Sequence, residues 1–281
     1  GIFLALRVNT IANLGAYVSF MGFGPSTGNV GGLAGVYTTP AMYVHVTAVF
    51  SNKNPISPYR GAGRPEASYV MERMVNIAAR ELGADPMDLR RQNLIPSSMM
   101  PYKTPLTFTY DCGEFEELMD RCAEKADYTG FKKRRADAKE KEILRGIGIA
   151  CTIEQAAAAQ PETAELRFDP SGTLTLLVGT TPHGQGHETI YKQLICEKLA
   201  LDPANIRVVE GNTDQVPFGT GTGGSRTATI GTSAVYEAIA KVVDKTKKVA
   251  AHNLEASEVD VVFERGVFNV SGTDRSVSFL E

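Results

Sequence analysis

The segment Val178–Thr189 carries the residues best suited to holding a ligand. It leaves an apolar run, passes through Gly184 and Gly186, and enters a stretch with apolar residues at helical spacing. The start of such a helix exposes unpaired backbone N–H groups, its dipole favours an anion, and glycine lets the backbone approach a ligand closely. Gln185 adds a side chain that donates and accepts hydrogen bonds, which suits a heterocycle edge. An ordinary glycine turn between a strand and a helix has the same pattern.

The two histidines of this segment, His183 and His187, permit a rival interpretation as zinc ligands. They are four residues apart, and Glu188 follows the second one. A helical zinc site of this type needs both histidines on one helix face and a glutamate directly after the first. Gly184 and Gly186 disfavour that helix. We therefore favour anion binding here and assign no metal ligand.

A second glycine-rich turn, Gly219–Thr227, also leads into a long stretch with helical periodicity. It contains Gly-x-Gly-x-x-Gly, but the preceding strand ends near Val209, so the tight strand–turn–helix of a dinucleotide fold is missing. No Gly-Lys-Ser/Thr sequence follows, which excludes a P-loop. The turn still offers amides, hydroxyls and Arg226, whose guanidinium can hold a phosphate by two parallel hydrogen bonds. Two such turns predict one elongated ligand with a phosphate-bearing tail, on which both converge.

A third candidate segment, Tyr59–Glu66, precedes the most regular helical pattern of the chain. Its two arginines stand beside small residues, which leaves room for a bulky group. The alternative is that Arg60 and Arg64 simply pair with carboxylates such as Glu66.

The elements that position these segments follow from periodicity and from turn residues. The first fifty residues alternate apolar and polar types in short runs broken by glycine, which predicts a sheet with one better-buried face. Proline and aspartate at helix starts and glycine at helix ends mark the helices. The predicted helices are 65–82, 86–93, 114–125, 188–200 and 232–252. The predicted strands of the second half are 147–153, 164–168, 173–178 and 206–209, with hairpins at 169–172 and 265–266.

The amino-acid composition limits the possible fold classes and the classes of binding partner. The 281 residues are 43% hydrophobic and carry a formal net charge of −3, which argues against nucleic acid as a partner. The basic run 132–135 is followed by acidic residues, which is typical of a solvated helix face. We place a domain boundary there, giving domains 1–125 and 126–281. The expected fold class is α+β or α/β, with mixed sheets and packed helices in two domains.

The spacing of the cysteines and the hydropathy of the sequence indicate in which cell compartment the protein is expected. The four cysteines are widely spaced and form no Cys-x-x-Cys pair, which is typical of reduced thiols in a cytoplasmic protein. There is no apolar run of about eighteen residues and no signal-peptide pattern at the start, so the sequence predicts no membrane span.

The three segments, in this order, resemble the large subunit of the molybdenum hydroxylases of the xanthine dehydrogenase and carbon monoxide dehydrogenase type. Residues 59–67 resemble the active-site loop of that family. Residues 180–189 resemble its Gln-Gly-Gln-Gly-His cofactor segment, with His183 in place of the usual glutamine, and residues 210–226 resemble the segment before its second cofactor-contacting helix. The likeness covers nearly the whole chain, so we expect two molybdopterin-binding domains.

The resemblance implies molybdopterin cytosine dinucleotide as cofactor, held largely by backbone amides. It places the catalytic loop at Arg60 and Gly61, facing the metal and the substrate. It also implies FAD and [2Fe-2S] clusters on partner subunits or domains and a homodimer of the complete complex. The cofactor-binding residues that it assigns are Ala62, His183, Gly184, Gln185, Gly186, His187, Gly224, Ser225, Arg226 and Thr227.

Two departures from the family pattern refine these expectations. The carbon monoxide oxidisers carry a cysteine that holds copper in the active-site loop, where this chain has Gly61. An aldehyde, an N-heterocycle or a similar small molecule is therefore the expected substrate. The family's Gly-Gly-Gly-Phe-Gly segment and its general-base glutamate are expected before residue 1 and after residue 281, so we expect residues 1–281 alone to be inactive. The alternative is a non-catalytic module that binds a nucleotide or phosphate.

Overall fold

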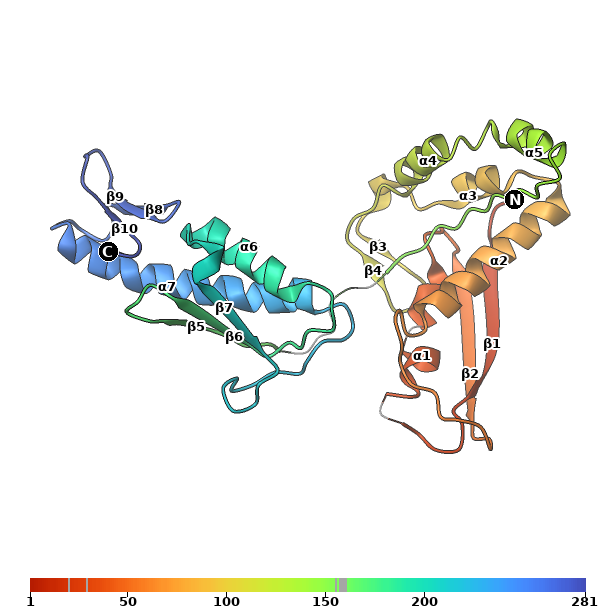
Figure 1. The fold of residues 1–281 in the computed structure, drawn as a ribbon. Coiled ribbons are helices and arrows are strands. Elements are labelled where there is room, and N and C mark those ends of the chain that lie inside the picture. Colours follow the sequence, from red (N-terminus) through yellow and green to blue (C-terminus); the bar gives the residue numbers. More distant parts are fainter. Residues whose placement is uncertain (20, 29, 155, 157–160) are drawn as a thin grey trace. The chain divides into compact units, whose positions relative to one another are not determined.

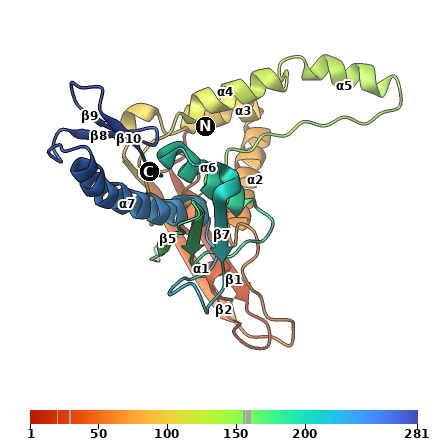
Figure 2. The ribbon, with the colours of Figure 1, turned by 60° about the vertical axis from the view of Figure 1, so that its left-hand side comes forward.

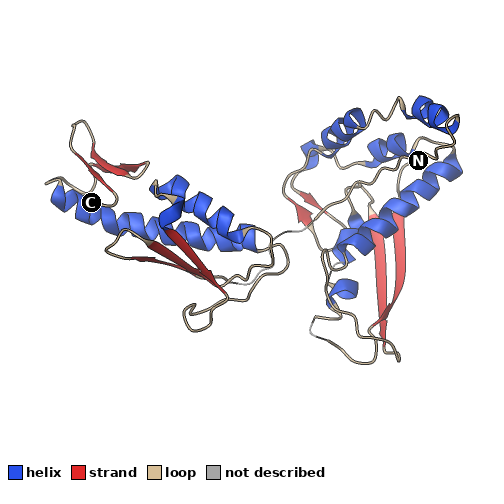
Figure 3. Cartoon of the chain, in the orientation of Figure 1, coloured by secondary structure: helices blue, strands red, loops and turns tan. Residues whose placement is uncertain are grey.

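The computed structural model describes residues 1–281 except 20, 29, 155 and 157–160, and it divides into two compact units (Figure 1). Unit 1 is Gly1–Glu154 and unit 2 is Gln155–Glu281. Each unit packs helices against small sheets, which Figure 3 shows by colour. The predicted fold class, mixed sheets with packed helices, is confirmed.

Unit 1 contains a parallel pair of strands, β1 (Ala5–Asn13) and β2 (Ala41–Val49). Over most of each strand, half-buried residues alternate with exposed ones, as the alternation in the sequence predicts. The connection between the strands contains α1 (Gly24–Thr27) and the 3-10 helix Val30–Ala34, which packs against the next long helix.

That long helix, α2 (Arg64–Leu82), begins with a proline at its start and ends at Gly83, whose φ of 63° is left-handed. Its buried side is formed by residues four apart, which pack on Val36 and Tyr37. The apolar residues of the sequence pattern, at 67, 70, 71, 74, 77, 78 and 82, do not form one buried face, because three of them are exposed. The buried residues are Ala67, Met71, Val75 and Ala79, and the exposed ones are Val70, Met74 and Leu82.

The helix α3 (Pro86–Asn93) brings a buried arginine to α2. Asp85 caps it as predicted, since its carboxylate accepts hydrogen bonds from two backbone N–H groups of the first turn. The fully buried Arg90 donates to Oε2 of Glu72 at 2.8 and 3.0 Å, and the hydroxyl of Tyr37 donates to Oε1 at 2.5 Å. Both carboxylate oxygens of Glu72 accept hydrogen bonds, and Arg90 supplies the opposite charge, which allows this glutamate to be buried.

The predicted strand at 147–153 is wrong, because the segment is a loop (Figure 3). Side chains satisfy its backbone in place of a neighbouring strand. Arg90 donates to the carbonyl of Ile149 at 3.1 Å, and the N–H of Cys151 donates to Oε2 of Glu72 at 2.8 Å. Its apolar side chains pack on the core of unit 1, and this compact unit therefore extends to Glu154.

The remaining elements of unit 1 are short. They are the 3-10 helix Ser97–Met99, β3 (Tyr102–Lys103), β4 (Thr109–Tyr110), α4 (Phe115–Lys125) and α5 (Phe131–Lys139). The basic run lies on α5, where only Ala138 is buried, and Figure 2 shows this helix projecting away from the strands. The predicted solvated helix is confirmed.

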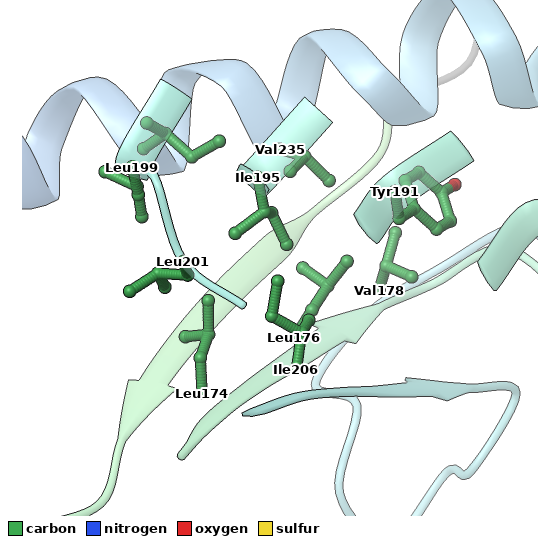
Figure 4. Packing of buried hydrophobic residues seen from close by; sticks show 10 residues of the cluster. Leu174, Leu176, Val178, Tyr191, Ile195, Leu199, Leu201, Ile206 and Val235 are labelled. Carbon is green, nitrogen blue, oxygen red and sulfur yellow. The ribbon is translucent and has the colours of Figure 1, made fainter. Parts of the chain in front are cut away.

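Unit 2 is built on a three-stranded sheet with β6 (Leu174–Val178) in the centre. β5 (Ala164–Phe168) pairs with it in antiparallel fashion through the predicted turn, and β7 (Ile206–Glu210) pairs in parallel. The helices α6 (His187–Leu199) and α7 (Thr232–Asn253) cover one face of the sheet (Figure 1). Apolar side chains of both layers, including Leu176, Ile195 and Val235, fill the space between them (Figure 4).

The end of unit 2 is a second small sheet. It consists of β8 (Val261–Glu264), β9 (Val267–Val270) and β10 (Ser276–Ser278), all antiparallel, and it packs on the end of α7. The predicted hairpin at 265–266 is confirmed. Two short helices complete the unit, the 3-10 helix Pro203–Asn205 and the π-helix Thr227–Gly231. Among the helices of the described residues, none combines the length and apolar character needed to cross a bilayer.

Replacement of Arg90 by alanine tests the buried network of unit 1. The variant leaves the carboxylate of Glu72 buried without its cation, so we expect the free energy of unfolding to fall by about 3–5 kcal/mol. Arg91→Ala is the control, because this neighbour pairs with carboxylates at the surface and should contribute about 1 kcal/mol or less. Urea unfolding of both variants measures the difference. Equal losses for the two would contradict the assigned role.

Candidate functional site

Two glycine-rich turns of unit 2 lie side by side at the end of its sheet. The N–H of Gly221 donates to the carbonyl of Gly179 at 3.2 Å, and the N–H of Thr181 donates to Oγ1 of Thr222 at 3.1 Å. An added Cβ atom at Gly179 would lie 2.3 Å from the Cα atom of Gly219, so the two backbones touch where neither residue has a side chain. The two turns are therefore in contact at residues 179–181 and 219–222, and their predicted convergence on one ligand stays a prediction.

The first turn joins β6 to α6 and is open to a ligand. Gly184 and Gly186 have φ angles of 91° and 82°, which side-chain-bearing residues rarely adopt. A Cβ atom at either position would meet no protein atom within 4 Å. Gln185 folds back onto the turn, where its Oε1 accepts from the N–H of His183 at 2.5 Å. The turn thus presents backbone, with space beside it.

The two histidines of the turn have different surroundings. His183 is exposed, and its Nε2 lies 3.3 Å from Oγ1 of Thr181. His187 is 3% exposed, its Nδ1 lies 2.8 Å from Oε1 of Glu210, and its Nε2 is buried without a hydrogen-bond partner among the described residues. Over the described ranges, no three His, Cys, Asp or Glu side chains are grouped to hold a metal ion. The two imidazoles thus have different polar neighbours, Thr181 for His183 and Glu210 for His187.

A buried polar cluster lies beneath the first turn, and sequence reasoning missed it. Glu210 at the end of β7 accepts a hydrogen bond from Thr180, and the hydroxyl of Thr180 lies 2.9 Å from that of Tyr191. Burial raises the pKa of Tyr191 to about 12, so its hydroxyl stays protonated at neutral pH. The sequence did contain a signal for this cluster: Glu210 is a charged residue at the end of an apolar strand, directly before Gly211.

The second turn is held from inside by Arg226. Gly221, Gly224 and Ser225 all have left-handed φ angles, of 74°, 60° and 57°. Arg226 is 2% exposed; it donates to Oε2 of Glu162 at 2.6 Å and to the carbonyl of Gly221 at 2.8 Å. The sequence predicts that this guanidinium holds a phosphate, whereas the structure places it against a buried carboxylate.

The other residues of the second turn show how it enters the long helix. Thr227 is buried, and its Oγ1 lies 3.0 Å from Oγ1 of Thr222. It opens the π-helix that precedes α7, and such irregular turns are frequent at functional sites. A Cβ atom at Gly223 would meet no protein atom within 4 Å, so this turn too has free space beside its backbone.

The third candidate segment lies in unit 1, before α2. Gly61, Ala62 and Gly63 have φ angles of 88°, 41° and 96°, so three successive residues are left-handed. Such a conformation at an alanine is uncommon and costly, and strained residues of this kind are enriched at functional sites. Arg64 pairs with Glu154 at 3.2 Å and not with Glu66.

A cavity of about 600 Å³ lies beside this loop. The loop forms one wall and β1 forms another, and most of the lining is apolar. Arg60 is exposed at the rim and takes part in no ion pair with the described carboxylates. Residues that line the cavity include Val8, Thr10, Ile56, Tyr59, Arg60 and Ala62.

The chain matches two family models, both described as molybdopterin cofactor-binding domains, over residues 1–94 and 121–281. It is 34% identical to the carbon monoxide dehydrogenase large chain of Hydrogenophaga pseudoflava, over 98% of this chain and 36% of that protein. It is 32% identical to the nicotine 6-hydroxylase large subunit of Paenarthrobacter nicotinovorans, over 86% of this chain and 31% of that protein. The chain thus spans about a third of the length of these relatives.

Solved structures show the same fold. The quinoline 2-oxidoreductase of Pseudomonas putida superposes with a TM-score of 0.88 at 28% identity, over 99% of this chain and 37% of that one. A Cu,Mo-containing carbon monoxide dehydrogenase superposes with a TM-score of 0.89 at 29% identity, over 100% and 38%. The chain therefore belongs to the molybdopterin cofactor-binding domain family of the xanthine dehydrogenase and carbon monoxide dehydrogenase type.

Proposed function

We propose that this chain is the cofactor-holding part of a molybdenum hydroxylase that oxidises or hydroxylates a small molecule at a molybdopterin centre. The observation that carries the proposal is the pairing of two glycine-rich turns in unit 2, each with open space beside its backbone. A long anionic cofactor needs such a surface, because it is held by N–H groups along its length.

The residues of the two turns fit molybdopterin cytosine dinucleotide. Gly184, Gly186 and Gly223 leave room that a side chain would fill, and the start of α6 favours an anion. Gln185 and Ser225 supply hydrogen-bonding side chains for a heterocycle or phosphate. Arg226 and His187 shape the turns from within. When bound, the cofactor supplies the redox chemistry, and the chain binds and orients it.

The loop before α2 is the proposed catalytic loop. Arg60 lies at the rim of the neighbouring cavity, where its charge can orient a polar group of the substrate. The largely apolar lining suits a planar, weakly polar substrate such as an aldehyde or an N-heterocycle. The names of two relatives, a nicotine hydroxylase and a quinoline oxidoreductase, support an N-heterocycle.

The complete protein would pass electrons to partners. The relatives are named as large chains or as subunits of complexes, which supports partner subunits for this chain as well. We propose FAD and [2Fe-2S] clusters on these partners and a homodimer of the complete complex. We also propose that the two family domains divide near residue 125, close to residue 121 where the second family match starts, although the compact units divide after Glu154. The alternative function, a non-catalytic module for a nucleotide or phosphate, would use the same open turns.

Replacement of Gly184 by valine in the full-length protein, purified with its partners, tests cofactor binding. We expect molybdenum in the wild-type protein and about a tenfold loss in the variant, which corresponds to about 1.4 kcal/mol of lost binding. Gly172→Val is a matched control, because Gly172 also has a left-handed φ and open space, but it lies in the β5–β6 turn. Elemental analysis gives the content. A metal-free but active wild type, or equal losses in both variants, would contradict the proposal.

Replacement of Gly61 by cysteine tests why the active-site loop has no copper ligand. The left-handed φ and the position of an added Cβ atom, 2.7 Å from Cγ of Pro65, both oppose a side chain. We expect a loss of about 1–3 kcal/mol in unfolding free energy and no gain of carbon monoxide oxidation. Gly83→Cys controls for backbone strain alone, since Gly83 is left-handed but has free space. A Gly61→Cys variant as stable as the wild type would show that the loop accepts cysteine.

A further inference from the structure

We propose that Glu210 is a positioning residue that sets the conformation of both glycine-rich turns for the cofactor. The inference rests on the proposed function, since it concerns how the same site is held. Glu210 lies at the last position of β7, and its side chain is 5% exposed. It therefore acts through the residues that it holds.

One oxygen of Glu210 serves the first turn. Its Oε1 lies 2.8 Å from Nδ1 of His187 and also accepts from the hydroxyl of Thr180. His187 is the first residue of α6 and directly follows Gly186, whose left-handed φ ends the turn. Thr180 follows β6 by two residues, at the other end of the same turn. The carboxylate of Glu210 thus connects both ends of the first turn to strand β7.

The same cluster reaches the helix that follows the second turn. The hydroxyl of Tyr191 lies 2.9 Å from Oγ1 of Thr180 and occupies the space beside Gly231. A Cβ atom at Gly231 would lie 2.7 Å from this hydroxyl, so the phenol fits only because residue 231 is glycine. Gly231 closes the π-helix that starts directly after Arg226. A path therefore runs from Glu210 to the start of α7, through hydrogen bonds as far as Tyr191 and through packing of the Tyr191 hydroxyl against Gly231.

The second turn has its own internal support, which keeps the two contributions separable. Arg226 is held by Glu162, whose side chain is fully buried and which lies just before β5. Removal of Glu210 leaves this ion pair in place. Nδ1 of His187 and the hydroxyl of Thr180 would then lose the oxygen that joins both ends of the turn to β7, while Thr180 would keep its contact with Tyr191.

The test compares three variants of the full-length protein purified with its partners. Glu210→Ala removes the acceptor, and we expect molybdenum per subunit to fall about tenfold. Glu210→Gln keeps an acceptor oxygen at the same place, so its content should stay within about threefold of the wild type. Leu199→Ala destabilises the same core at the far end of α6, and it should retain its molybdenum although its unfolding midpoint falls at least as far.

Hydrogen exchange on the metal-free forms adds a readout that does not depend on cofactor loading. In Glu210→Ala, we expect faster exchange at the N–H groups of 183–190 and 228–234, with no change at the β8–β9 hairpin. A Glu210→Ala variant with wild-type molybdenum and exchange would overturn the inference and leave the proposed function intact. So would loss of molybdenum in proportion to stability across all three variants. A wild-type protein without molybdenum would instead overturn the proposed function.

Discussion

The contact between the backbones at Gly179 and Gly219 is the constraint on which the candidate site depends. A side chain at either residue would be within 2.3 Å of the other backbone, and the hydrogen bond from Gly221 to Gly179 could then not form. Because the turns touch here, the ends of β6 and β7 and the starts of α6 and α7 share one edge of the sheet. Ligands of open α/β sheets are commonly bound at such strand ends.

Buried polar side chains support both turns from the interior of unit 2. Arg226 forms an ion pair with Glu162, and His187 lies within hydrogen-bond distance of Glu210, in both cases with side chains at most 5% exposed. Buried ion pairs contribute little net stability but impose a particular geometry, since each charge must find its partner. In unit 1 the same device, Arg90 with Glu72, anchors the loop 147–153. The protein thus uses charge for placement in both units.

Most of the fold could be predicted from the sequence because local signals agreed with packing. The capped helix at Asp85, the hairpin at 169–172 and the two helix starts after glycine all depend on residues close in the chain. The segment 147–153 could not be recognised as a loop from its own residues. Its backbone is bound by Arg90 and Glu72, which lie more than 50 residues away in the sequence. The same limit applied to Arg226 and Glu210. Their residue types were visible in the sequence, but whether a charge points outward or inward depends on distant partners.

The parallel strand pairs bear on how the chain folds. Ala5 pairs with Ala41 and Leu174 with Ile206, so each pairing joins residues more than 30 positions apart, whereas the hairpins β5–β6 and β8–β9 close locally. Loop-closure entropy delays such long-range pairing relative to hairpins and helices. Since the last residue of β7 belongs to the parallel pair, both glycine-rich turns are expected to reach their final shape only after this long-range pairing has formed. A chain halted before that pairing would have its helices and hairpins, but the edge of the sheet where the two turns meet would not yet exist.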